Sequence, residues 1–109
     1  MRFAVVVIAT SIFLVAATAS ASVRKVSFTA SVATGDYATL MVNVSPRSRC
    51  TIKVVYDTTV SHAKGLGPKT GGKITWRWRI GTNTHAGRWP VTVDCGKAGK
   101  LIVRLRVGA

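Results

Sequence analysis

The side chains best suited to catalysis or metal binding are few in this chain of 109 residues: two cysteines, two histidines and three aspartates, with no glutamate. They are Cys50, Cys95, His62, His85, Asp36, Asp57 and Asp94. Their spacing matches none of the short ligand patterns of zinc sites, and no Gly-x-Ser-x-Gly motif supplies a nucleophile for hydrolysis. We therefore expect no enzyme activity, no resident metal and no cofactor.

One segment comes close to a phosphate-binding loop. Gly67 to Lys73 fits the pattern Gly-x-x-x-x-Gly-Lys, but Ile74 stands where a serine or threonine is required. The residues that follow alternate like a strand, whereas the motif needs the N-terminus of a helix. We therefore reject a nucleotide-binding loop.

The first 21 residues have the pattern of a secretory leader. Arg2 precedes an apolar run, Phe3 to Ala17, which ends in Ala19-Ser20-Ala21, the small-x-small pattern that signal peptidase cuts. The run is shorter than the about 20 residues that a bilayer crossing needs. We predict a signal peptide over 1–21 with cleavage after Ala21; cleavage after Ala19 and retention as an anchor are the alternatives. Residues 22–109 then form one domain without a membrane span, secreted or associated with the cell envelope.

The two cysteines both lie in the exported part of the chain. A domain of this size buries only about 60–65% of its unfolded surface, so its stability is marginal without a further constraint. Export delivers the thiols to an oxidising space, and two cysteines permit one intramolecular pairing. We predict a Cys50–Cys95 disulfide, which closes a loop of about 46 residues and contributes about 4 kcal/mol in the chain-entropy description.

The charge of the chain is strongly unbalanced. Sixteen lysines and arginines stand against three acidic residues, for a net charge of +13. Such a domain attracts polyanions over about one Debye length, about 8–10 Å. Anionic cell-wall polymers, lipid head groups, acidic polysaccharides and nucleic acid are candidate partners; the plainer alternative is that the charge keeps an exported domain soluble.

The candidate residues lie in a chain that is predicted to form β-strands. From Val23 onward apolar and polar residues alternate with period two, which is typical of half-buried antiparallel strands. The apolar positions fall in six segments, 26–32, 38–44, 50–56, 74–80, 89–95 and 101–107. A short seventh edge strand is expected within 58–63. Two packed sheets bury six apolar faces, so we predict an all-β sandwich of six or seven antiparallel strands.

The register of the strand over 74–80 follows from the cost of burying charge. If Trp76 and Trp78 faced water, Arg77 and Arg79 would be buried in a chain with almost no carboxylates. An unpaired buried charge costs several kcal/mol. We therefore expect both tryptophans in the core, together with Trp89, instead of forming a stacking platform for sugars or bases.

Two segments carry a family resemblance. Residues 72–81, GKITWRWRIG, contain Gly-x-x-x-Trp-x-Trp, and residues 84–95, THAGRWPVTVDC, contain Gly-x-Trp-x-Val-x-Val. With residues 50–56 and 63–66 they resemble secreted bacterial immunoglobulin-like modules. The resemblance covers roughly residues 23–107. It implies an immunoglobulin-like β-sandwich and an accessory role on exported proteins, with no catalytic residues.

Two departures from that pattern affect the cysteines and Trp89. Lettered as in such modules, the six strands are A, B, C, E, F and G, so Cys50 opens C and Cys95 ends F. The bridge then joins adjacent strands, whereas antibody domains link the second and sixth. Trp89 opens strand F, where related domains often place a tyrosine whose hydroxyl ties the preceding loop; tryptophan supplies only a donor, so we do not assume that bond.

The arginines fall in two pairs on the outer faces of two strands, Arg77 with Arg79 and Arg104 with Arg106. The strands lettered E and G belong to opposite sheets in an immunoglobulin-like sandwich. The two pairs then form no single groove. This favours positive charge spread over the protein surface rather than a dedicated binding site.

The loop over 58–72 is the other candidate contact region, because loops on a rigid scaffold often carry binding. It holds two lysines, and a third follows directly after it. The candidate polyanion contacts are accordingly Lys64, Lys69, Lys73, Arg77, Arg79, Arg104 and Arg106.

These observations lead to one expected function and one alternative. We expect a monomeric, non-enzymatic binding or structural module that associates with an anionic cell-wall polymer or polysaccharide, without specific nucleic-acid binding. The alternative is a secreted basic effector acting on anionic membranes or polyanions, which the lack of an amphipathic helix disfavours.

Overall fold

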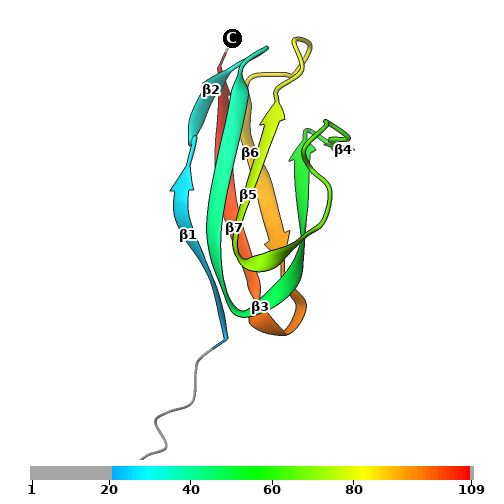
Figure 1. Cartoon of the computed structure of the whole chain (residues 1–109). Coiled ribbons are helices and arrows are strands. Elements are labelled where there is room, and N and C mark those ends of the chain that lie inside the picture. The colour runs from blue at the N-terminus through cyan, green and yellow to red at the C-terminus, as the bar shows by residue number, and fades with distance from the viewer. Residues whose placement is uncertain (1–20, 109) are drawn as a thin grey trace, which may run out of the picture.

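The computed structural model describes residues 21–108, so the predicted leader lies outside the described residues except for Ala21. This part of the chain is all β, with no α-helix (Figure 1). The strands are β1 (Ser22–Phe28), β2 (Ser31–Ala33), β3 (Tyr37–Tyr56), β4 (Thr59–Val60), β5 (Lys69–Arg79), β6 (Gly87–Asp94) and β7 (Lys100–Gly108), with a short 3-10 turn, η2 (Gly96–Ala98), before β7.

The long strand β3 organises the sheet by changing partners along its length. Its first half pairs antiparallel with both β1 and β5, and its second half pairs antiparallel with β6 over Thr51–Val54. The sheet continues from β6 to β7 and β2, in the order β1-β3-β6-β7-β2, and β4 and β5 add to β3. The sheet therefore curls, with its two parts on either side of a common core (Figure 1).

The expectation of one strand over 26–32 is wrong. β1 ends at Phe28 and pairs with β3, whereas β2 begins at Ser31 and pairs with β7. Val26 lies at a register shift and is 47% exposed, whereas Val32 is buried. The two halves of this alternating segment therefore belong to two different parts of the sheet, and the chain crosses from one to the other after Phe28.

Two further expectations about the strands need correction. β2 runs parallel to β7 over Ser31–Ala33, so the strands are not all antiparallel. The segments 38–44 and 50–56, expected as two separate strands, form one strand, β3. Pro46 lies between Asn43 and Ser48, where the β3–β5 ladder shifts register, so its missing N–H costs the ladder no hydrogen bond.

The core confirms the inward register of the two tryptophans of β5. Trp76 and Trp78 are fully buried, whereas Arg77 and Arg79 are exposed. The rings pack in one cluster with the apolar faces of β3, β6 and β7; its largest fully buried members include Leu40, Ile80, Leu105, Val42, Val54, Val91 and Val93. No polar or charged residue is buried among residues 21–108.

The segment between β4 and β5 covers the edge of β5 that faces away from β3. Trp76 Nε1 donates a hydrogen bond of 2.9 Å to the carbonyl oxygen of Gly67, and Gly65 lies against the Arg77 carbonyl. β4 is the short seventh strand expected within 58–63, and it pairs with the end of β3. Near Trp76 and Arg77 this segment shields the edge of β5 from pairing with another chain.

The predicted disulfide is confirmed. Cys50 and Cys95 are bonded, and both are buried. The neighbouring residues Thr51 and Asp94 are partners in the β3–β6 ladder. The bridge therefore links two adjacent antiparallel strands, as expected, at the end of the β3–β6 ladder; Cys50 lies within the long strand β3 and Cys95 directly follows β6.

Trp89 ties the connection between β5 and β6. Its ring is half-buried against the core, and its Nε1 donates a hydrogen bond of 2.9 Å to the carbonyl oxygen of His85. The indole N–H thus donates to a carbonyl four residues upstream, a bond that the sequence did not predict. This bond fixes the loop between β5 and β6.

Candidate functional site

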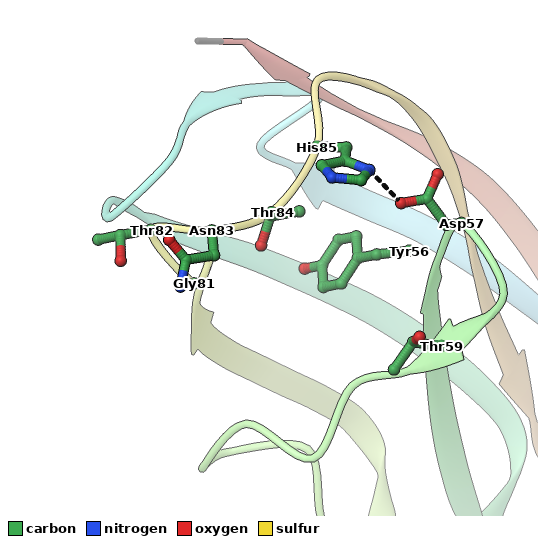
Figure 2. Close-up of a pocket in the computed structure, with 8 residues that line it drawn as sticks. All are labelled: Tyr56, Asp57, Thr59, Gly81, Thr82, Asn83, Thr84 and His85. Atoms are coloured by element: carbon green, nitrogen blue, oxygen red, sulfur yellow. Dashed lines mark ion pairs between the residues drawn. The ribbon is translucent and has the colours of Figure 1, made fainter.

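A hollow opens at the end of the molecule where β3 finishes and the β5–β6 connection begins (Figure 2). Its volume is about 460 Å³. Apolar atoms contribute most of its lining surface, and its only charged or imidazole side chains among the described residues are one aspartate and one histidine; the lining consists of Tyr56, Asp57, Thr59, Gly81, Thr82, Asn83, Thr84 and His85.

Two turns build the walls of this hollow. Asp57 has a φ of 54°, a left-handed conformation that aspartate tolerates better than most residues, and it turns the chain from β3 into β4. On the other side, the N–H of Thr84 donates to the carbonyl oxygen of Gly81, which closes the turn after β5. The hollow therefore lies between two tight connections.

An ion pair joins the two walls. His85 Nδ1 lies 2.7 Å from Asp57 Oδ2 (Figure 2). The side chains are 77% and 47% exposed, so water screens the pair and its contribution to stability is small. Within residues 21–108 the His85 imidazole makes no hydrogen bond to a hydroxyl group that it would activate as a nucleophile. The contact between His85 and Asp57 therefore lacks the third group of a catalytic triad within these residues.

The phenol of Tyr56 lies at the inner side of the hollow. Its oxygen accepts a hydrogen bond of 3.1 Å from Trp78 Nε1. Burial raises the pKa of Tyr56 because the phenolate would be poorly solvated, and the hydrogen bond from Trp78 opposes this shift. Tyr56 is therefore a neutral hydroxyl at ordinary pH, anchored to the core.

The seven cations predicted as polyanion contacts are all exposed, and the structure does not bring them together. Lys64 lies in the loop before β5. The others lie on two strands that do not pair: Lys69, Lys73, Arg77 and Arg79 on β5, and Arg104 and Arg106 on β7. Because both strands turn their apolar residues to the same core, their arginines point outward from opposite sides of it.

Three of the seven cations have partners within the fold. The Arg77 guanidinium lies 4.1 Å from the centre of the Tyr37 ring. Arg79 Nε donates to the carbonyl oxygen of Gly35, and Lys69 Nζ donates to that of Thr75. These contacts hold the three side chains against the protein surface. Part of the hydrogen-bonding capacity of the basic face on β5 is therefore used within the fold.

Sequence reasoning missed one contact and one residue that the structure places beside this chemistry. Asp57 and His85 were considered as candidates, but they are distant in the sequence and no spacing predicted that they meet. Arg88 was left out because the expected strand began at Trp89, whereas β6 begins at Gly87. Extending the alternation of the expected strand by one residue toward the N-terminus would have placed Arg88 on its outer face.

Ion pairs neutralise little of the positive charge. Residues 21–108 hold fifteen lysines and arginines, all exposed. In this part of the chain the ion pairs are His85–Asp57 and Lys100–Asp94, the latter at 3.9 Å. Fourteen of the fifteen therefore have no carboxylate within ion-pair distance in the part of the chain described here.

No family model, curated protein or solved structure matches the chain. Among the described residues there is no group of histidines, cysteines and acidic residues that could hold a metal ion. The same residues contain no helix long and apolar enough to span a membrane.

Proposed function

We propose that this protein is an exported, non-enzymatic module that binds anionic polymers of the cell envelope through its basic surface. The main support is that all fifteen lysines and arginines of residues 21–108 are exposed. Within these residues one of them, Lys100, is in an ion pair. Like charges at this density repel one another, and a polyanion relieves the repulsion. Binding of this kind releases counterions and weakens steeply with salt.

The Cys50–Cys95 bridge supports export, because disulfides persist in oxidising compartments. The leader pattern over 1–21 points to the same route. Together they support a location outside the cytoplasm, where wall polymers and acidic polysaccharides are the expected polyanions.

We further propose that the curled sheet is an immunoglobulin-like sandwich. The support is its strand order: β1, the first half of β3 and β5 on one side, and the second half of β3, β6 and β7 on the other. This corresponds to strands A, B and E against C, F and G. The short β2, parallel to β7, would then be the part of strand A that has crossed to the second sheet.

Sedimentation with polymer tests the proposed function. The oxidised protein is mixed with isolated cell envelope, or with insoluble polyanion beads, at about 20 mM salt and then at about 0.5 M, where the Debye length falls to about 4 Å. We expect co-sedimentation at low salt and release at high salt. The control is the same protein with its lysines acetylated, which keeps the arginines and lowers the charge; we expect weaker binding.

Two results would overturn the proposal. The first is failure to sediment at low salt. The second is retention at high salt with no effect of acetylation, which would indicate a neutral binding site such as the hollow beside Tyr56. Leakage of dye from anionic vesicles would instead support the alternative of an effector that acts on membranes.

A further inference from the structure

Arg88 and Arg106 face each other across two neighbouring strands. They are direct partners in the antiparallel β6–β7 ladder, and both side chains are exposed. Directly opposed residues project from the same face with their Cβ atoms about 4.5–5.5 Å apart. Two guanidinium groups are therefore held side by side on the outer face of the sheet.

Among the described residues, none of the three aspartates, Asp36, Asp57 and Asp94, forms an ion pair with Arg88 or Arg106. Asp94 is six residues further along β6, about 20 Å away at the rise of a strand, and it already contacts Lys100 and accepts a hydrogen bond from the Gly96 N–H. Asp57 follows the end of the β3–β6 ladder and is bonded to His85. Like charges placed directly opposite each other destabilise a sheet, so the pair favours a bound anion.

The space beside the two arginines is hollowed. Residues 86–88 and 106–108 line a concavity of about 400 Å³. Gly108 has no side chain, and nothing lies within 4 Å of where its Cβ would be, so this end of the hollow is open. Ser31 is the partner of Arg106 on its other side, so an exposed hydroxyl group extends the row.

We propose that Arg88 and Arg106 form a site for a single tetrahedral oxyanion, the phosphate or sulfate ester of an anionic polymer. A guanidinium presents a fork of N–H donors to two oxygens. The oxygens of a phosphate or sulfate ester are arranged tetrahedrally, so two forks can approach one group from different directions, whereas the two oxygens of a carboxylate lie in one plane and present one edge that matches a single fork. This inference rests on the proposed function and adds to it a preferred chemical group and a place of contact.

The two arginines of β5 provide a matched comparison. Arg77 and Arg79 are two residues apart on one strand, and the structure engages them with the Tyr37 ring and the Gly35 carbonyl. They carry the same charge as Arg88 and Arg106 and are equally exposed. Neither Arg77 nor Arg79 lines either of the two hollows described above. Loss of either pair removes two positive charges.

The experiment compares the double variants Arg88→Gln/Arg106→Gln and Arg77→Gln/Arg79→Gln in binding to polyphosphate at fixed low salt. Circular dichroism and thermal unfolding first establish that both variants are folded. We expect the Arg88/Arg106 variant to lose about tenfold or more in affinity relative to the Arg77/Arg79 variant, because charge-assisted hydrogen bonds are lost as well as charge. Arg88→Lys/Arg106→Lys should recover only part of the loss, because lysine lacks the fork.

Two further polymers test the chemistry. Dextran sulfate bound with the same dependence on Arg88 and Arg106 would support the tetrahedral site and show that a sulfate ester also fills it. Tighter binding of polygalacturonate than of polyphosphate would overturn it, because that polymer carries only carboxylates. Equal losses in the two double variants would overturn the site and leave the diffuse basic surface intact. Failure of the unmodified protein to bind any of the three would instead overturn the proposed function.

Discussion

Trp78 Nε1 donates a hydrogen bond of 3.1 Å to the hydroxyl oxygen of Tyr56. Trp78 is fully buried in β5, and Tyr56 is the last residue of β3. The bond therefore joins two strands from different parts of the curled sheet, at the inner side of the hollow. It also satisfies the donor of a tryptophan that has no contact with water.

The first prediction concerns the loss of this bond. Tyr56→Phe leaves the Trp78 N–H buried without an acceptor, and we expect the free energy of unfolding to fall by about 1–3 kcal/mol. The control is Tyr37→Phe, since the Tyr37 side chain is 49% exposed and its ring stays beneath Arg77. Urea unfolding measures both. Equal stability of Tyr56→Phe and the unmodified protein would show that the bond contributes nothing.

The second prediction is a pH dependence from the same residue. Burial raises the pKa of Tyr56 above its ordinary value of about 10, so the folded state holds the phenolic proton more tightly than the unfolded state. The resulting stabilisation is complete below about pH 10 and is lost as the pH rises through the folded-state pKa. We expect stability to fall more steeply above about pH 10 in the unmodified protein than in Tyr56→Phe. Lysines titrate in both proteins, so parallel curves would contradict the prediction.

The alternation of side chains predicted the strands and the inward tryptophans well because both depend on local polarity. Trp76 and Trp78 had to face inward because Arg77 and Arg79 cannot be buried without partners. The bridge was predictable because two cysteines allow only one intramolecular pairing. These conclusions need no knowledge of which strand lies beside which.

The errors arose where pairing decided the outcome. The segment over 26–32 alternates correctly for one strand, but its two halves bond to β3 and β7, and local polarity does not distinguish those partners. Proline cannot donate the N–H that a strand ladder uses. Pro46, however, lies at a register shift, where no ladder hydrogen bond is lost. The opposition of Arg88 and Arg106 likewise follows from the β6–β7 register, which no spacing in the sequence specifies.

The third prediction separates the two roles of the loop before β6. Trp89→Phe keeps a ring against the core but loses the bond to the His85 carbonyl, which should cost about 0.5–1.5 kcal/mol. His85→Ala keeps that carbonyl and removes only the exposed ion pair with Asp57, so we expect a change of about 0–1 kcal/mol. Thermal unfolding compares the two variants. A larger loss in His85→Ala than in Trp89→Phe would mean that the ion pair, and not the indole, holds the loop.

The fourth prediction tests the segment that covers β5. Gly65 has a φ of 94°, and a Cβ there would overlap the carbonyl oxygen of Arg77. Because that carbonyl belongs to the sheet backbone, Gly65→Ala should destabilise the protein by more than about 1 kcal/mol. Gly67→Ala is the matched control in the same segment, since nothing lies within 4 Å of its added carbon. Similar stability of the two variants in urea would show that this segment does not pack on β5 as described.

The fifth prediction concerns the disulfide. Replacing both Cys50 and Cys95 with alanine removes the loop constraint on the unfolded chain, and we expect a loss of about 2–4 kcal/mol in the free energy of unfolding. The lysines and arginines are held by strands that pair without the bridge, so polyphosphate binding below the unfolding transition should change by less than about twofold. Urea unfolding and a binding titration at low temperature measure the two effects. Loss of binding in a variant that is still folded would mean that the bridge positions the basic surface itself, which the separate ladders of β5 and β7 argue against.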